Sequence, residues 1–240
     1  MKSNKVVFLT GDVINVFYIT KSTNKKINGK AERIVQSMHF SFDQWALANA
    51  PRKVSMREFF SADEPNCLNC PYSFNSGNSK CYTHKYMQFS GMMSQLRSIP
   101  PEALTPLNAL KRDALLTMVK GRYMRFGAYG EPVYTPLGLV RDIVNNASSW
   151  TGYTHQWSNP NFNGYHLYFM ASVHNVKEAF EASTFGYRSF ISAIKDELAD
   201  VNAVQCPASK EANYKSSCDI CQLCSGIQGK GAKDVKINTH

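Results

Sequence analysis

From about residue 122 the chain alternates between strand-like and helix-like segments, and this alternation limits the fold more than any other feature. The strand-like segments are rich in aromatic and β-branched residues and lie at residues 123–132, 150–157, 165–173, 188–192 and 202–206. Helix-like segments lie between them at residues 136–149, 176–187 and 193–200. Such alternation indicates parallel strands joined by crossover helices. The sequence therefore predicts an α/β protein, either a partial (β/α) barrel or an open parallel sheet.

Two further segments precede this region. Residues 1–60 are expected to form a basic, β-rich extension, with a strand pair at residues 5–20, a polar loop at 21–30 and a helix beginning at Ser41. Residues 61–121 are expected to combine an irregular cysteine-bearing loop with a helix that Gly121 ends. Residues 122–240 carry the alternating segments, and we expect all three parts to share one compact domain.

Polar and aromatic side chains follow several of the predicted strands. They are Tyr129, Glu131, His155, Trp157, Ser172, His174 and Cys206. Reactive groups in α/β folds gather at the carboxyl ends of the strands. We therefore predict Tyr129, His155 and His174 as candidate catalytic residues.

The strongest motif lies near the end of the chain, where four of the seven cysteines fall within nineteen residues. Cys218, Cys221 and Cys224 are spaced C-x2-C-x2-C, and the more distant Cys206 is followed by a proline. This arrangement is typical of [4Fe–4S] ligands in bacterial ferredoxins, whereas zinc sites favour separated C-x2-C pairs. The four cysteines predict an iron–sulfur cluster, with zinc as the alternative.

A second group, Cys67-x2-Cys70-x10-Cys81, is followed three residues later by His84. These four side chains fit a Cys3His zinc site. Three cysteines also fit a second iron–sulfur cluster with one iron open to substrate, and the remaining alternative is three thiols without a ligand.

Other cofactor chemistry has little support. A radical S-adenosylmethionine enzyme would carry C-x3-C-x2-C before its barrel strands, and neither cysteine group has that spacing. The sequence contains no P-loop, dinucleotide-binding fingerprint, H-E-x-x-H or G-x-S-x-G motif.

The net charge and the number of cysteines indicate what the protein binds and in which compartment it is found. The net charge is +9, and residues 1–60 carry ten Lys and Arg against four Asp and Glu. This balance favours contact with nucleic acid, for which the aromatic residues Phe8, Phe17 and Tyr18 are the expected surface. An odd cysteine count and the lack of a predicted signal peptide or membrane span indicate a reducing cytoplasm and argue against structural disulfides.

Five short blocks carry a resemblance to a known family. They are CLNCPYSFNSGNSKCY, RFGAYGEP, WTGYTHQW, MASV and CPASKEA…CDICQLCSG, in this order between residues 65 and 226. The chain resembles a family of cysteine-rich bacteriophage proteins with a C-terminal CPAS…C-x2-C-x2-C motif. The resemblance implies the host cytoplasm and an iron–sulfur cluster.

Three functions compete at this point. The first is a cluster enzyme doing desulfidase-like chemistry on a small thiol substrate, which would lie against Tyr129, His155 and His174, with an iron holding the sulfur and a nearby base assisting C–S cleavage. The second is a nucleic-acid-binding protein with a structural cluster or zinc ion. The third is an inactive interaction module held together by zinc.

Overall fold

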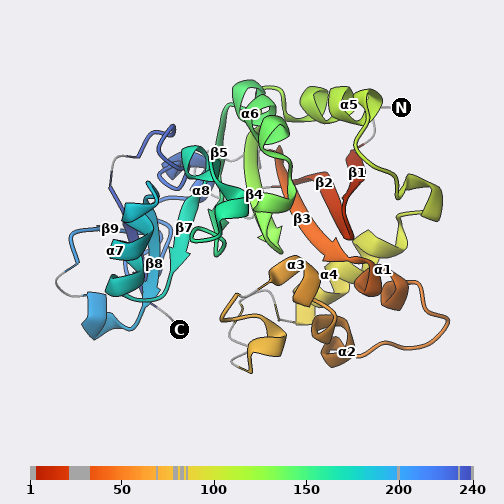
Figure 1. Cartoon of the computed structure of the whole chain (residues 1–240), viewed down its shortest axis with the longest axis horizontal. Helices are drawn as coiled ribbons and strands as arrows, with labels where there is room; N and C mark the ends of the chain where they lie inside the picture. Colours follow the sequence, from red (N-terminus) through yellow and green to blue (C-terminus); the bar gives the residue numbers. More distant parts are fainter. Residues whose placement is uncertain are drawn as a thin grey trace.

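The computed structural model describes residues 4–21, 33–68, 70–77, 81, 84, 86–198, 201–231 and 233–238. Its strands form two five-stranded sheets that lie side by side, with helices packed against both (Figure 1). The predicted α/β class is confirmed, since one of the two sheets is entirely parallel. Most of the predicted polar loop at residues 21–30 lies outside the described residues.

The first sheet contains strands from both the N-terminal segment and the alternating region. Its strand order is β1 (Lys5–Thr10), β2 (Val13–Lys21), β3 (Arg33–Ser41), β4 (Tyr123–Tyr129) and β5 (Ser149–Thr151). The first three strands are antiparallel, whereas β3, β4 and β5 run parallel to one another. Because β3 pairs with β4, the N-terminal segment and the alternating region share one sheet.

The second sheet is built only from the alternating region and the tail. Its strand order is β6 (Tyr153–Thr154), β7 (Met170–Val173), β8 (Ser189–Ala193), β10 (Val235–Asn238) and β9 (Val204–Gln205). The last strand in sequence, β10, inserts between β8 and β9 and is parallel to both.

The chain passes from one sheet to the other at Gly152. The sequence predicts one strand across residues 150–157, but the structure divides it into β5 and β6, which belong to different sheets. A Cβ atom at Gly152 would lie 2.6 Å from Cδ1 of Phe169. Only glycine therefore allows the backbone to pass this close to the core.

Helices cover both faces of the first sheet. One face packs against α1 (Phe42–Ala48), α2 (Met56–Ser61) and α4 (Tyr86–Arg97), and the other against α5 (Ala109–Val119) and α6 (Leu137–Asn146) (Figure 1). Alternation along β1 produces this division, since Val6 and Phe8 face one layer and Val7 the other.

The remaining helices are short, apart from α7. They are α3 (Glu64–Cys67), α7 (Val176–Thr184), α8 (Cys218–Cys221) and the 3₁₀ helices η1 (Phe74–Ser76), η2 (Pro101–Ala103), η3 (Pro132–Tyr134), η4 (Pro160–Phe162), η5 (Tyr165–Leu167) and η6 (Lys195–Leu198). Ser41 caps α1 as predicted, with Gln44 completing a reciprocal capping box. Among the described residues, no helix combines the length and apolar character required to cross a membrane.

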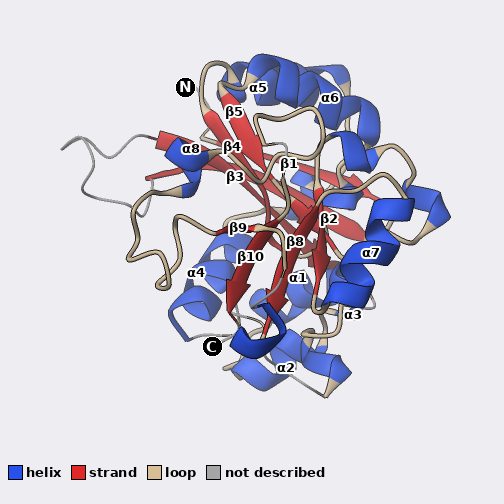
Figure 2. Ribbon diagram, turned by 90° about the vertical axis from the view of Figure 1, so that its left-hand side faces the viewer, coloured by secondary structure: helices blue, strands red, loops and turns tan. Residues whose placement is uncertain are grey.

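The two faces of the second sheet are covered by different kinds of layer. Ala171, Val173 and Ile191 pack with α7, whereas Met170 and Val235 pack with Cys224 on the other face. Figure 2 shows α7 and α8 on opposite sides of β8 and β10. The cysteine-bearing segment thus takes the place that a crossover helix would occupy.

Candidate cysteine sites

The four C-terminal cysteines line a single pocket. Cys206 directly follows β9, Cys218 and Cys221 begin and end α8, and Cys224 lies three residues further on. All four line one narrow pocket together with Tyr153 and Val235. We name these four residues the C-terminal cysteine pocket.

The pocket lies at the amino-terminal ends of the parallel strands. Cys224 and Cys206 pack with Tyr153, Met170 and Val235, which are the first residues of β6, β7 and β10. Because Cys206 follows a predicted strand, the sequence predicted that the cysteine site would lie at the carboxyl ends of the strands, beside the other candidate residues. That placement is wrong for the pocket as a whole, because the segment after Cys206 folds back beneath the sheet.

One buried arginine, which the sequence analysis missed, holds this segment in place. Nη1 of Arg188 donates to the carbonyl oxygens of Leu223 at 3.1 Å and Gly226 at 2.9 Å, and its Nη2 donates to the Lys233 carbonyl. The amide of Gly152 also donates to the Cys224 carbonyl, at 3.0 Å. In the sequence, the only indication of this role is that Arg188 directly precedes the apolar strand β8.

Burial controls the acidity of the pocket thiols. It raises the pKa of Cys206 to about 11 and that of Cys224 to about 12, although a hydrogen bond with Tyr153 opposes the second shift. Burial also raises the pKa of Cys218, against the opposing charge of Arg125. As free thiols, these groups therefore stay protonated at neutral pH, and a bound metal centre would displace their protons.

A second constellation lies at the carboxyl ends of β4 and β6, where the sequence predicted chemistry. Sγ of Cys70 lies 3.7 Å from Nε2 of His155, and Nδ1 of His155 lies 2.8 Å from Oε1 of Glu131. Glu131 is buried and also accepts hydrogen bonds from the Thr154 hydroxyl at 2.7 Å and the His155 amide at 3.1 Å. His155 is thereby fixed between a thiol and a carboxylate.

These contacts set the charge of the two histidines. Burial by itself would lower the pKa of His155, but its hydrogen bonds with Cys70 and Glu131 outweigh burial and raise it to about 10. The ring of His174 stacks on that of His155 at 5.3 Å. Burial, followed by the charge of His155, lowers the pKa of His174 to about 4. The ring of Tyr72 meets His174 edge-on at 4.3 Å.

Tyr129, the third predicted catalytic residue, is part of the core. It is 2% exposed, its hydroxyl accepts a hydrogen bond from Gln44 at 2.6 Å, and its ring packs against Phe40 and Phe60. Burial raises its pKa well above the usual value for tyrosine. These contacts indicate a structural role for this side chain.

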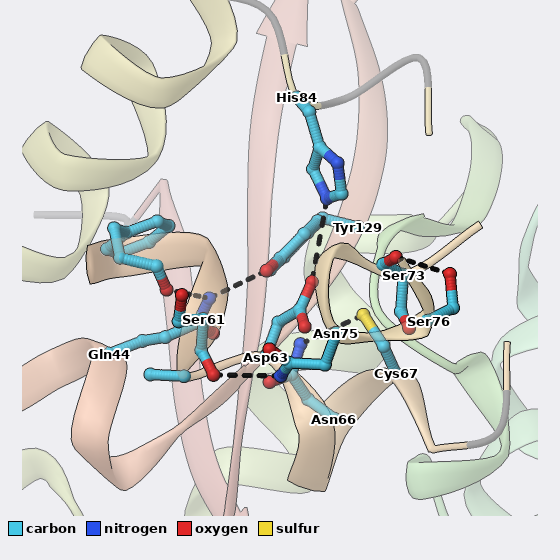
Figure 3. A network of polar contacts seen from close by, with 12 residues as sticks. Gln44, Ser61, Asp63, Asn66, Cys67, Ser73, Asn75, Ser76, His84 and Tyr129 are labelled. Carbon is cyan, nitrogen blue, oxygen red and sulfur yellow. Dashed lines mark hydrogen bonds and ion pairs between the residues drawn. The ribbon is translucent and has the colours of Figure 1, made fainter. Parts of the chain in front are cut away.

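The residues of the second predicted group contact different partners in the structure. This group consists of Cys67, Cys70, Cys81 and His84. His84 points at Asp63, with its Nε2 3.5 Å from a carboxylate oxygen, while the Cys67 sulfur accepts a hydrogen bond from Asn66 at 3.6 Å (Figure 3). Burial raises the pKa of Cys67 strongly, and the neighbouring Asp63, Cys70 and Cys81 add to the shift. The three thiols are thus near one another, but Cys70 contacts His155 and His84 contacts Asp63.

Asp63, another residue that the sequence analysis missed, is fully buried beside His84. In the described part of the chain, neither oxygen of Asp63 and neither ring nitrogen of His84 makes a hydrogen bond. His84 also packs its ring against Phe60 at 4.4 Å. The contact of 3.5 Å with the Asp63 carboxylate gives the His84 ring a polar neighbour within the fold.

Neither cysteine group forms a compact single-ion site. Among the described residues, no three Cys, His, Asp or Glu side chains are grouped closely enough to hold one metal ion. The iron–sulfur and zinc assignments from the sequence therefore stay predictions.

The two sites lie at opposite ends of the second sheet. His174 follows the last residue of β7, whereas Met170, which packs with the pocket, is its first. Four residues of parallel strand span about 13 Å. A substrate held between His155 and His174 would not lie directly against the C-terminal cysteine pocket.

Two of the three aromatic residues expected to contact nucleic acid lie in the core instead. Phe8 and Phe17 are both 0% exposed and stack on each other with ring centroids 5.7 Å apart. Buried rings cannot stack on bases, so Phe8 and Phe17 do not form such a surface, whereas Tyr18 is half-buried.

Comparison of the chain with protein-family models, curated proteins and solved structures finds no match.

Proposed function

We propose that this chain is an iron–sulfur protein in which Cys206, Cys218, Cys221 and Cys224 hold one [4Fe–4S] cluster. The observation that carries the proposal is that these four cysteine residues line one pocket although Cys206 comes from a separate segment. Four thiolates are the usual ligand set of such a cluster, and the C-x2-C-x2-C spacing with a distant Cys-Pro is typical of it.

The ligand set favours electron transfer or a structural role over desulfidase-like chemistry. Capturing a substrate sulfur requires an iron without a protein ligand, and four cysteine thiolates leave none open. A bound cluster of this kind supplies one-electron transfer.

The surrounding side chains support a negatively charged group. Arg125 places a positive charge near Cys218, and Arg188 does the same near Cys224 while fixing its loop. Together they offset part of the charge that four thiolates would bring into a partly buried site.

Anaerobic purification, a visible spectrum and a count of iron, sulfide and zinc test this proposal. We expect a brown protein with about four irons and four sulfides per chain. Cys206→Ser, Cys218→Ser and Cys224→Ser should each lose most of the colour.

Cys67→Ser and Cys81→Ser are the matched controls, since they make the same substitution in the other group. They should keep the absorbance and iron content of the unaltered protein. A colourless protein with one bound zinc would overturn the proposal, and so would loss of the cluster in the two controls alone.

A further inference from the structure

We propose that Cys67 and Cys70 form a redox-active dithiol that exchanges with small disulfides, with His155 as the imidazolium partner of the Cys70 sulfur and Glu131 as the positioning residue of His155. This activity goes beyond the proposed cluster and does not depend on it. The C-x2-C spacing of these two residues fits a zinc or cluster site, but in the structure Cys70 contacts His155.

The first support is the alignment of a thiol, an imidazole and a carboxylate. A nucleophile is activated by a base within reach, and the base is oriented by a third group. Cys70, His155 and Glu131 have this order, with 3.7 Å between thiol and imidazole and 2.8 Å between imidazole and carboxylate. Contacts without substrate are often longer than in the reacting complex.

Glu131 is itself fixed, which fixes the imidazole. Its two oxygens accept from the His155 amide and the Thr154 hydroxyl, and its own amide donates to the Asn66 carbonyl at 2.8 Å. Because Nδ1 of His155 is engaged by this carboxylate, Nε2 is the nitrogen that faces Cys70.

The second support is the turn that joins the two cysteines. The amide of Cys70 donates to the carbonyl of Cys67 at 3.2 Å, which closes a four-residue turn. Such a turn brings its end Cα atoms within about 7 Å, and a disulfide needs about 4.4–6.8 Å. Both cysteines are free thiols in the structure. The Cα separation of such a turn therefore overlaps the range that a Cys67–Cys70 disulfide needs.

The third support is access from solvent. The side chain of His155 is 21% exposed, and Cys70, whose sulfur contacts it, is 9% exposed. The neighbouring residues His174 and Tyr72, whose rings contact each other, are half-buried. A small disulfide needs only to present one sulfur to Cys70, which suits a shallow site better than a deep pocket would.

The exchange balances without another reagent. With the proton held on His155, Sγ of Cys70 attacks one sulfur of the substrate as the thiolate, and the substrate S–S bond breaks as a mixed disulfide forms. The leaving thiolate takes a proton from His155. Cys67 then attacks Sγ of Cys70, releasing the second substrate thiol, so the protein dithiol is oxidised and the substrate disulfide is reduced.

Incubating the native full-length protein with oxidised glutathione, followed by peptide mass mapping, tests the inference. The unaltered protein should form a Cys67–Cys70 disulfide and release two reduced glutathiones per chain. Cys67→Ser should stop at one glutathione bound to Cys70. Cys70→Ser should not react in this loop, and Cys81→Ser should behave as the unaltered protein does.

The role of His155 has its own measurement. His155→Gln should slow formation of the mixed disulfide by about 100-fold or more at pH 7, because the imidazolium that stabilises the attacking thiolate and protonates the leaving thiolate is lost. Its far-ultraviolet circular dichroism should match that of the unaltered protein. If Cys70→Ser fails to fold, the mapped order of modification in the unaltered protein decides the question, since Cys70 must react before Cys67 and Cys81.

Three results would overturn the inference. They are equal modification of Cys67, Cys70 and Cys81, an unchanged rate in His155→Gln, and loss of one zinc per chain in Cys70→Ser. The last would show a metal site instead. Failure of the cluster proposal would appear as missing iron and would leave these mapping results unchanged.

Discussion

His39 shows how burial decides the chemistry of a single residue. It lies on β3, is 0% exposed, and its Nδ1 lies 2.9 Å from the Asn15 side-chain oxygen. Its Nε2 lies 3.2 Å from the Ser37 hydroxyl, which also accepts from the Gly127 amide. A neutral ring satisfies both contacts, with Nδ1 donating and Nε2 accepting. Burial lowers the pKa of His39 to about 3.

This shift makes stability depend on pH. The unfolded chain takes up the His39 proton near pH 6.5, whereas the folded chain does so only near pH 3. The unfolded state therefore binds more protons between these values, and stability falls as pH falls through the window. The free energy of unfolding should drop by about 1 kcal/mol per pH unit below 6.5 on account of this residue.

Urea unfolding at pH 6.5 and 5.0 measures the effect. His39→Gln, which cannot titrate in this range, should lose less stability between the two pH values than the unaltered protein. His174 also has a lowered pKa and contributes in both proteins, so the difference isolates His39. Equal losses in the two proteins would contradict the prediction.

At the scale of elements, the end of β4 depends on one glycine. Gly130 has a φ of +71°, and a Cβ atom there would lie 2.5 Å from the His39 carbonyl oxygen. Because β4 passes close to β3 at this residue, the amide of Glu131 can donate a hydrogen bond to the Asn66 carbonyl. The position of Glu131 beneath His155 thus requires glycine at the preceding residue.

Gly130→Ala should lower the free energy of unfolding by about 2–4 kcal/mol, because it adds left-handed strain to a backbone clash. Gly138→Ala is the matched control, since it lies in α6 with nothing within 4 Å of the added methyl group. The control should be neutral or stabilise the protein by up to about 1 kcal/mol. Equal effects of the two substitutions in urea unfolding would contradict this explanation.

At the scale of the whole molecule, the two sheets are covered by different kinds of structure. The first has helical layers on both faces, whereas one face of the second is covered by the irregular cysteine-bearing segment (Figures 1 and 2). Arg188 fixes that segment through three carbonyl groups. We therefore expect the second sheet to open independently of the first.

Arg188→Met should speed hydrogen exchange at the amides of β8 and β10 by about 30-fold, corresponding to about 2 kcal/mol of lost hydrogen bonding. Amides of β2 and β3 should keep their protection. Arg112→Met removes an exposed ion pair with Asp142 and serves as the control, with little change anywhere. Uniform acceleration across both sheets would show that they open as one unit.

Several elements could be predicted because their signals are local. The hairpin of β1 and β2 follows from alternation around Gly11 and Asp12, and α1 from the Ser41 cap. The sequence analysis did not predict β3, α4 or β10. The last is a four-residue strand with one buried residue, and it exists because β8 and β9 pair with it.

By itself, the sequence determined the α/β class, the candidate ligand set at Cys206 to Cys224 and the strand ends that carry His155 and His174. These features depend on periodicity and spacing, which are properties of neighbouring residues. Only the tertiary structure decided that the cysteine pocket lies at the amino ends of the strands and that Cys70 meets His155, 85 residues away in the chain. Such contacts arise from the way the sheets pack, which no local pattern records.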